Sequence, residues 1–147
     1  MKPIVYCNGE FVEEQNAKVS IFDRGYLFGD GVYEVVPVVN GQLIDKIEFL
    51  ARLQRSLSEL ELEWPCSQIE YVAMLETLIE RNELVEGSVY TQVTRGVAPR
   101  DFSFPDNTPT TCMAFTTAKS YLSSPQAEAG VEVITVEDLR WKRSEER

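Results

Sequence analysis

The stretch "SIFDRGYLFGDGVYEVVPVVNGQLI", residues 20–44, carries the strongest structural signals in the chain. Its first half, residues 20–31, holds three glycines, two acids, an arginine and three aromatics. This composition predicts a compact irregular connection that is packed by its own aromatic side chains. The second half runs to Asn40-Gly41, a pair that favours a two-residue type I′ turn because both positions accept positive φ. We therefore expect a β-hairpin over residues 31–44.

The residues before this stretch repeat the same signal. Asn8-Gly9 lies between "PIVYC" and "EFV", which predicts a first hairpin over residues 3–13.

Two amphipathic helices are expected after the second hairpin. The first begins with Asp45 as N-cap and Glu48 three residues later, and it ends before Pro65. Its apolar stripe is Ile47, Leu50, Leu53, Leu57 and Leu60. The second begins with the capping box "SQIE" at 67–70 and ends near Asn82. Its apolar face is Val72, Leu75, Leu78 and Ile79.

After Gly87 the apolar residues alternate again, which predicts strands. We expect strands over residues 88–96, 110–118 and 131–137, with a proline-containing loop over 97–109. The sum is an α+β fold of two β-hairpins, two helices and further antiparallel strands.

Composition excludes several classes of function. The formal charge of −10 argues against a nucleic-acid-binding surface, and no apolar run is long enough for a membrane span. The chain has no histidine, which removes Ser-His-Asp hydrolysis and histidine metal sites. The three cysteines are widely spaced and odd in number, and the N-terminus lacks the apolar core of a signal peptide. We therefore expect a reduced, cytoplasmic protein with no membrane or nucleic-acid partner.

Three positions are candidates for binding. Arg52 flanks the apolar stripe of the first helix, where it is either an arginine with a buried stem and exposed head or an anion ligand. Arg100 lies on the 97–109 loop, either as a solvated side chain or as part of a binding loop. Tyr33 and Val35 share one face of their strand, so a phenol stands beside an apolar wall. From the residues alone, these alternatives stay open.

The segments "DRGYLFGDGVYEVV", "YCNGEFV" and "YTQVTRGVAPRDFSFPDNT" together resemble the class IV, fold-type-IV pyridoxal-phosphate aminotransferases, and most of all the D-amino acid (D-alanine) transaminases. The resemblance implies the D-amino acid aminotransferase-like fold and a homodimer that exchanges amino groups between amino acids and 2-oxo acids. It also implies that pyridoxal 5′-phosphate lies between two domains. Residues 1–120 would be the small N-terminal domain, and 121–147 the interdomain connector with a truncated start of the cofactor-binding domain.

The resemblance also assigns roles to residues. Tyr33 matches the tyrosine that holds the substrate α-carboxylate, and Arg100 matches the loop arginine that reaches the same carboxylate from the neighbouring subunit. Arg52 matches the arginine that binds the cofactor phosphate. Val35 matches a residue that lines the pocket for the substrate side chain.

Three departures from the family pattern are visible. D-amino acid transaminases commonly have a histidine at the positions of Phe102 and Phe49. The Schiff-base lysine would fall near Arg147, and Lys142 does not match its motif, so no catalytic residue is assigned. We expect this chain to be a truncated form that is inactive alone, with Trp141 packing in the parent enzyme against a domain absent here. The alternatives are a non-catalytic dimerisation or interaction module, or a fragment of an aminodeoxychorismate lyase or branched-chain aminotransferase.

Overall fold

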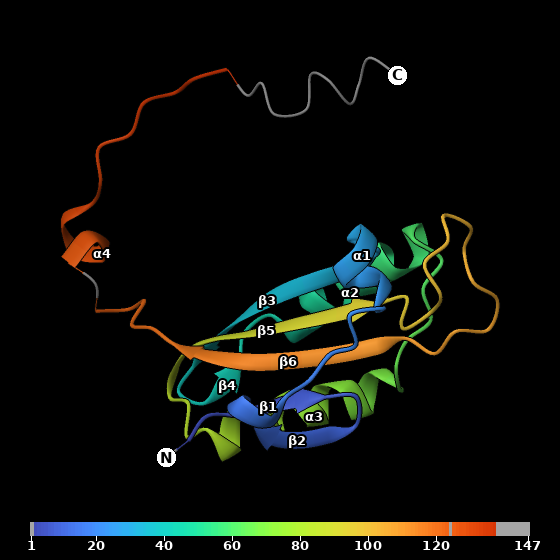
Figure 1. The fold of residues 1–147 in the computed structure, drawn as a ribbon. Coiled ribbons are helices and arrows are strands. Elements are labelled where there is room, and N and C mark those ends of the chain that lie inside the picture. The colour runs from blue at the N-terminus through green and yellow to red at the C-terminus, as the bar shows by residue number, and fades with distance from the viewer. Residues whose placement is uncertain (1, 124, 138–147) are drawn as a thin grey trace.

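The structure is a computed structural model that describes residues 2–123 and 125–137. Within this part of the chain, six strands form one antiparallel sheet in the order β2-β1-β6-β5-β3-β4 (Figure 1). The strands are β1 (Ile4–Cys7), β2 (Glu10–Glu13), β3 (Gly31–Val39), β4 (Gln42–Leu43), β5 (Glu86–Thr94) and β6 (Thr111–Ala118). The helices are α1 (Arg24–Phe28), α2 (Lys46–Glu59), α3 (Gln68–Arg81) and α4 (Pro125–Ala129), with a 3₁₀ turn, η1 (Glu14–Asn16).

Both predicted hairpins are confirmed. β1 pairs with β2 around Asn8-Gly9, and β3 pairs with β4 around Asn40-Gly41, with positive φ at all four turn residues. The strand β3 continues beyond its hairpin and pairs with β5 along its full length, while β5 pairs with β6. The first hairpin joins this sheet where β1 pairs with β6.

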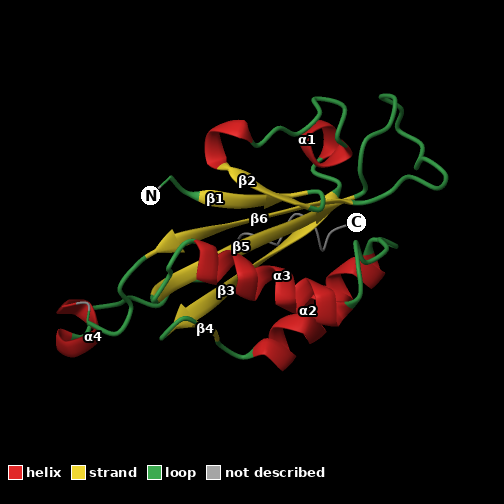
Figure 2. Ribbon diagram, turned by 90° about the horizontal axis from the view of Figure 1, so that it is seen from below, coloured by secondary structure: helices red, strands yellow, loops and turns green. Residues whose placement is uncertain are grey.

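The hydrophobic core lies between one face of the sheet and helices α2 and α3, which lie in front of the strands in Figure 2. Alternate residues of β3 and β5 point into this core, among them Val36, Val38, Val89 and Val93, all fully buried. The α+β fold of two hairpins, two main helices and further antiparallel strands is therefore confirmed.

The apolar stripe predicted for the first helix is partly wrong. Leu53 and Leu57 are buried as expected, but Ile47 is 80% exposed and Phe49 is fully buried. The spacing of Phe49, Leu53 and Leu57 is four residues, which places all three on one face of the helix. The phenyl ring buries more apolar surface than Ile47 would, and it packs on Tyr71 of α3 with ring centroids 6.4 Å apart.

The two helix starts differ in how they are capped. The capping box at Ser67 is confirmed, because its hydroxyl accepts from the backbone N–H of Glu70 while the Glu70 carboxylate accepts from that of Ser67. At the start of α2, Asp45 is the N-cap but has a φ of 50°, and its side chain accepts no capping hydrogen bond. The predicted boundary of α2 is therefore right, although the capping mechanism was wrong.

Residues 20–31 are more regular than predicted. They contain helix α1, whose start is capped by Asp23 Oδ1, which accepts a 2.8 Å hydrogen bond from the N–H of Gly25. The prediction that its own aromatics pack the segment holds for Phe28, whose ring centroid lies 4.7 Å from the Arg24 guanidinium carbon, but Phe22 and Tyr26 are exposed. The buried Arg24 side chain also holds the segment in place.

The last predicted strand is not formed. Residues 131–137 pair with none of the described strands, and the side chains of Val133 and Ile134 are exposed. Alternation predicts which side chains share a face, but a strand also needs a neighbour that completes the ladder of hydrogen bonds.

The chain leaves the sheet after Ala118 (Figure 1), and residues 119–122 form hydrogen bonds with Glu86 at the start of β5. The carboxylate of Glu86 accepts hydrogen bonds from the backbone N–H groups of Tyr121 and Leu122, the latter at 2.7 Å. These hydrogen bonds lower the pKa of Glu86. The domain boundary near residue 120 stays a prediction.

Candidate functional site

Tyr33 and Val35 lie on the sheet face opposite helices α2 and α3. They are 64% and 46% exposed, whereas their neighbour Val36 is fully buried on the other face. The Tyr33 ring stacks on Tyr90 of β5 with centroids 5.6 Å apart, and Tyr90 stacks on Phe115 of β6 at 4.9 Å. A ladder of three aromatic rings thus crosses three strands, and it places the Tyr33 phenol beside the apolar side chain of Val35.

The hydroxyl of Tyr33 is available for a ligand, because it makes no hydrogen bond with another described residue. The Tyr90 hydroxyl, by contrast, donates to Gln92 Oε1 at 2.8 Å. Burial, followed by the neighbouring Tyr33, raises the pKa of Tyr90, so this phenol stays protonated at neutral pH.

Tyr33 borders a hollow of about 200 Å³ between α1 and β5. Two glycines allow this arrangement. A Cβ on Gly25 would clash with Thr94 Cγ2, so only glycine lets α1 approach β5 this closely. Gly29 ends α1 with a φ of 66°, in the left-handed region.

Arg52 lies on α2 and reaches Glu34 on the helix-covered side of β3. Its Nε and Nη2 atoms donate to the same Glu34 oxygen, at 3.3 and 3.1 Å. The Arg52 side chain is 54% exposed and that of Glu34 13%. Glu34 thus orients the guanidinium, while Nη1 makes no hydrogen bond within the described residues. The free Nη1 and the exposed head suit one arm of a phosphate site, since phosphate accepts from several donors.

Arg100 lies on the loop before β6, beside Phe28 at the C-terminal end of α1. Its guanidinium carbon is 5.6 Å from the Phe28 ring centroid and 5.3 Å from that of Phe102. It forms no hydrogen bond or ion pair with another described residue. The structure therefore brings Tyr33 and Val35 together on one face, but it joins neither Arg52 nor Arg100 to them through any contact in the described chain.

A buried ion-pair network beneath Arg100 was missed by the sequence analysis. Asp30 Oδ2 accepts from Arg24 Nε at 2.7 Å and from Arg95 Nε at 2.8 Å. Burial would raise the pKa of Asp30, but the hydrogen bonds from Arg95 and Arg24 outweigh it, and the pKa is lowered. In the sequence, these three charged residues are marked only by their position next to glycines. Charged residues in solvated turns have the same kind of neighbours, so this position does not predict a buried network.

Phe49 and Phe102, where the resemblance led us to expect histidines, have different surroundings. Phe49 is fully buried in the core, whereas Phe102 is 78% exposed on the loop. Phe49 therefore has a packing role, and Phe102 contacts Arg100 directly.

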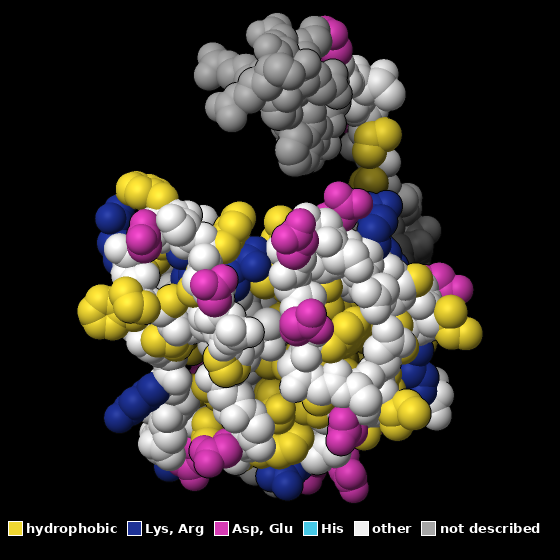
Figure 3. All heavy atoms as spheres, turned by 90° about the vertical axis from the view of Figure 1, so that its right-hand side faces the viewer, with side chains coloured by type: hydrophobic (Ala, Val, Ile, Leu, Met, Phe, Trp, Pro, Cys, Tyr) yellow, Lys and Arg dark blue, Asp and Glu magenta, His cyan; other side chains and the backbone are white. Residues whose placement is uncertain are grey.

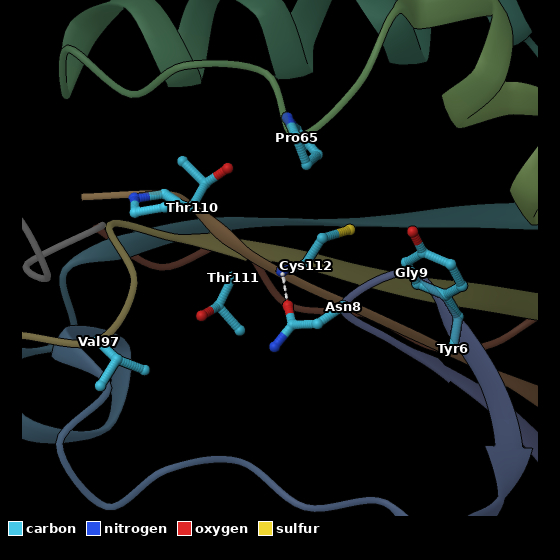
Figure 4. Close-up of a pocket in the computed structure, with 9 residues that line it drawn as sticks. Tyr6, Asn8, Gly9, Pro65, Val97, Thr110, Thr111 and Cys112 are labelled. Carbon is cyan, nitrogen blue, oxygen red and sulfur yellow. Dashed lines mark hydrogen bonds between the residues drawn. The ribbon is translucent and has the colours of Figure 1, made fainter. Parts of the chain in front are cut away.

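A separate pocket of about 470 Å³ lies between β1, the residues after α2 and the start of β6 (Figure 4). Tyr6, Asn8, Pro65 and Cys112 are among the residues that line it, and no predicted site residue does. Asn8 Oδ1 accepts from the Cys112 N–H at 2.8 Å, which ties the first hairpin to β6. Burial, with a smaller effect of Cys66, raises the pKa of Cys112 to about 12. Its thiol is therefore protonated at neutral pH and a poor nucleophile.

Two further findings on the described residues concern metal binding and membrane spanning. They contain no group of three or more His, Cys, Asp or Glu side chains that could hold a metal ion. No described helix has both the length and the apolar character that crossing a membrane requires. Arg147, near which the Schiff-base lysine was expected, lies outside the described residues, as do Lys142 and Trp141.

Comparison with known sequences gives one consistent family. The model of the class IV amino-transferases matches residues 31–147. A D-alanine aminotransferase of Staphylococcus epidermidis is 45% identical over 143 residues, which are 95% of this chain and 49% of that protein. One from Listeria monocytogenes is 43% identical over 141 residues, with the same coverage. The chain thus spans about half the length of the curated relatives it matches.

Comparison with solved structures agrees on the fold. A branched-chain amino acid aminotransferase of Escherichia coli superposes with a TM-score of 0.76 at 18% identity, over 86% of this chain and 43% of that one. A 4-amino-4-deoxychorismate lyase from Pseudomonas aeruginosa gives 0.62 at 22% identity, over 83% and 42%. The family match over residues 31–147, together with this shared fold, shows that the chain belongs to the class IV aminotransferases.

Proposed function

We propose that this chain supplies the substrate-carboxylate side of a D-alanine-type transaminase, which exchanges the amino group of a D-amino acid with a 2-oxo acid. The observation that carries the proposal is the 45% identity to a D-alanine aminotransferase along 95% of the chain. The structural neighbours include branched-chain aminotransferases and a lyase, but at 18–22% identity they support the shared fold alone.

The proposed carboxylate site consists of Tyr33 and Arg100. The free Tyr33 hydroxyl donates one hydrogen bond to the carboxylate, and the planar guanidinium of Arg100 donates two parallel ones. Val35, two residues from Tyr33 on the same face, limits the space for the substrate side chain.

This arrangement requires two copies of the chain. Arg100 packs beside the end of α1 and makes no contact with Tyr33 within the described residues. We infer a homodimer in which Arg100 of one copy faces Tyr33 of the other. Exposed apolar side chains on the loop that carries Arg100, namely Val97, Phe102 and Phe104, support such an interface. In Figure 3, which shows this end of the molecule, hydrophobic side chains reach the surface between charged ones.

The cofactor of this reaction is pyridoxal phosphate. When bound, it supplies the electron-withdrawing ring that makes the α-proton of an amino acid removable. Arg52 would hold its phosphate with the free Nη1, while Glu34 keeps the guanidinium in place through Nε and Nη2. The free thiols of all three cysteines support the proposed cytoplasmic location, where thiols stay reduced.

A chimera tests the proposal. Residues 1–137 are joined to the second half of the Staphylococcus epidermidis D-alanine aminotransferase, and amino-group exchange is measured with 2-oxoglutarate as acceptor. We expect exchange with D-alanine and not with L-alanine. Arg100→Lys should raise the KM for D-alanine at least about tenfold, because one ammonium cannot form the paired hydrogen bonds. The matched control, Arg55→Lys on the exposed side of α2, should leave KM unchanged.

The same assay separates the alternatives. A folded, cofactor-loaded chimera that prefers L-leucine would support a branched-chain aminotransferase, and one that releases pyruvate from aminodeoxychorismate would support a lyase. A chimera that loads the cofactor and exchanges no substrate would support the non-catalytic module.

A further inference from the structure

Arginine and phenylalanine side chains form one continuous stack at the α1 end of the molecule. Guanidinium groups and phenyl rings alternate, with each guanidinium carbon 4.3–5.6 Å from the next ring centroid. In order of contact, this arginine–phenylalanine stack consists of Arg95, Phe104, Arg24, Phe28, Arg100 and Phe102. The stack therefore links the end of β5, helix α1 and the loop that carries Arg100.

The inner end of the stack is neutralised and the outer end is not. Asp30 pairs with both Arg24 and Arg95, and the three side chains are 4–12% exposed. Arg100 has no such partner in the described chain, and the neighbouring Asp101 carboxylate accepts instead from the Ser103 N–H at 3.3 Å. Arg100 is thus the uncompensated charge of the stack, although the whole chain has a formal charge of −10.

Arg24 also fixes the backbone that follows Arg100. Its Nη1 donates to the carbonyl oxygen of Asp101 at 2.8 Å and to that of Ser103 at 3.2 Å. These two carbonyls lie on either side of Phe102, whose ring contacts both Phe28 and Arg100. One buried guanidinium thereby determines the path of the loop and the place of the ring against which Arg100 lies.

We propose that Arg24 and Phe28 are positioning residues for Arg100. The rings of Phe28 and Phe102 hold the guanidinium by contacts that use no N–H group. The N–H edge is then free for a carboxylate, in a geometry that is set before the ligand arrives. The inference rests on the proposed function only in naming a substrate carboxylate as the ligand. The positioning itself is a property of the folded chain.

The first test measures the loop in the absence of ligand. Arg24→Lys keeps a positive charge beside Asp30, but its ammonium cannot bind the carboxylate and both carbonyls in one fixed fork. We expect the backbone NMR order parameters of residues 101–104 to fall, and the Arg100 Nε–Hε NMR signal to move because the ring currents change. The order parameters of Val89 and Val93 in the core should stay at their wild-type values. Arg55→Lys, the matched control, should change none of these signals.

The second test separates the ring from the ion pairs. Phe28→Leu removes the aromatic surface but leaves Arg24 bound to Asp30 and to the loop carbonyls. We expect the Arg100 Nε–Hε signal to move while the backbone order parameters of residues 101–104 stay at their wild-type values, and Phe28→Tyr to retain the wild-type signal. If Arg24→Lys fails to fold, the Phe28→Leu protein alone tests the positioning proposal. An unchanged Arg100 signal in the folded Phe28→Leu protein would overturn the proposal, as would an unchanged loop and signal in folded Arg24→Lys.

The third test uses pyruvate as the carboxylate probe, at constant ionic strength with chloride as the reference anion. We expect pyruvate to shift the Arg100 signal of the wild-type chain, with at least about fivefold weaker binding in Arg24→Lys. If pyruvate leaves Arg100 unshifted while Arg24→Lys still loosens the loop, the ligand role of Arg100 in the proposed function fails and the positioning stands. If pyruvate binds both proteins equally, the positioning role fails.

Discussion

Asp30 and Arg24 form a 2.7 Å ion pair in which both side chains are almost fully buried, at 9% and 4% exposure. The same Asp30 oxygen accepts from Arg95, so one carboxylate neutralises two buried guanidinium groups. Ion pairs removed from water contribute little net stability while intact, but the loss of one partner leaves a charge uncompensated. Asp30 therefore controls both the stability of this end of the fold and the surroundings of Arg100.

Replacing Asp30 with asparagine should destabilise the protein by about 3–5 kcal/mol, because two buried arginines lose their counter-charge. Urea unfolding followed by circular dichroism measures this. The control is Glu76→Gln, which breaks the exposed pair with Lys46 and should cost less than about 1 kcal/mol. Similar losses of unfolding free energy in the two variants would show that the buried ion pairs of Asp30 matter no more to stability than the exposed pair.

The same carboxylate predicts a pH dependence of stability. The folded pKa of Asp30 is lowered, whereas the unfolded value is about 3.9. Its stabilising effect is therefore fully present above about pH 4 and is lost as the pH falls through the lower, folded pKa. Free energies of unfolding measured between pH 7 and pH 3 should fall more steeply for the wild type than for Asp30→Asn. Parallel curves would contradict the lowered pKa.

Introducing histidine at the two family positions should have opposite outcomes. Phe49→His places an imidazole in the core without a hydrogen-bond partner, and should cost more than about 2 kcal/mol. Phe102→His lies on an exposed loop position and should change stability by less than about 0.5 kcal/mol. Thermal unfolding at pH 8, where the imidazole is neutral, compares them directly. A stable Phe49→His protein would mean that this position can open towards a ligand.

The three thiols should react with iodoacetamide in a fixed order. Cys112 is buried and has a pKa of about 12, so at pH 8 only about one molecule in ten thousand holds the thiolate. Cys66 is half-buried, and burial, followed by Glu70, raises its pKa. We expect Cys7 to react first and Cys112 only on unfolding, as followed by mass spectrometry of peptides. Early labelling of Cys112 in the folded protein would contradict this.

The elements that the sequence predicted correctly are those with a local cause. Asn8-Gly9 and Asn40-Gly41 adopt positive φ, which these residue types accept through their own local geometry, and the Ser67 capping box needs only residues within one turn. The prediction of a strand over 131–137 was wrong because alternation of apolar residues indicates which side chains share a face, but not whether a neighbouring strand is present to pair with. The helix stripe failed at Ile47 because the face of α2 that turns to the core is that of Phe49, Leu53 and Leu57, and Ile47 lies away from it.

The residues of the candidate site also differ in whether their arrangement follows from local sequence. Tyr33 and Val35 were placed on one face by alternation alone, and the structure agrees. The network of Arg24, Asp30 and Arg95 joins residues up to 65 positions apart, and no periodicity of charged residues distinguishes it from a solvated turn. Buried ion pairs are created by tertiary contacts, so they become visible only in the folded chain.

The place of the first hairpin has a consequence for how the protein is made. The hairpin leaves the ribosome before the other described strands, but its sheet neighbour is β6, and the Asn8 side chain accepts from the N–H of Cys112, 104 residues later. At about 5–20 residues per second, the hairpin waits about 5–20 s for that strand. During this interval the side of β1 that will face β6 is an unpaired edge. Synthesis therefore exposes the nascent chain to intermolecular strand pairing, and slower translation through residues 8–118 should increase its aggregation.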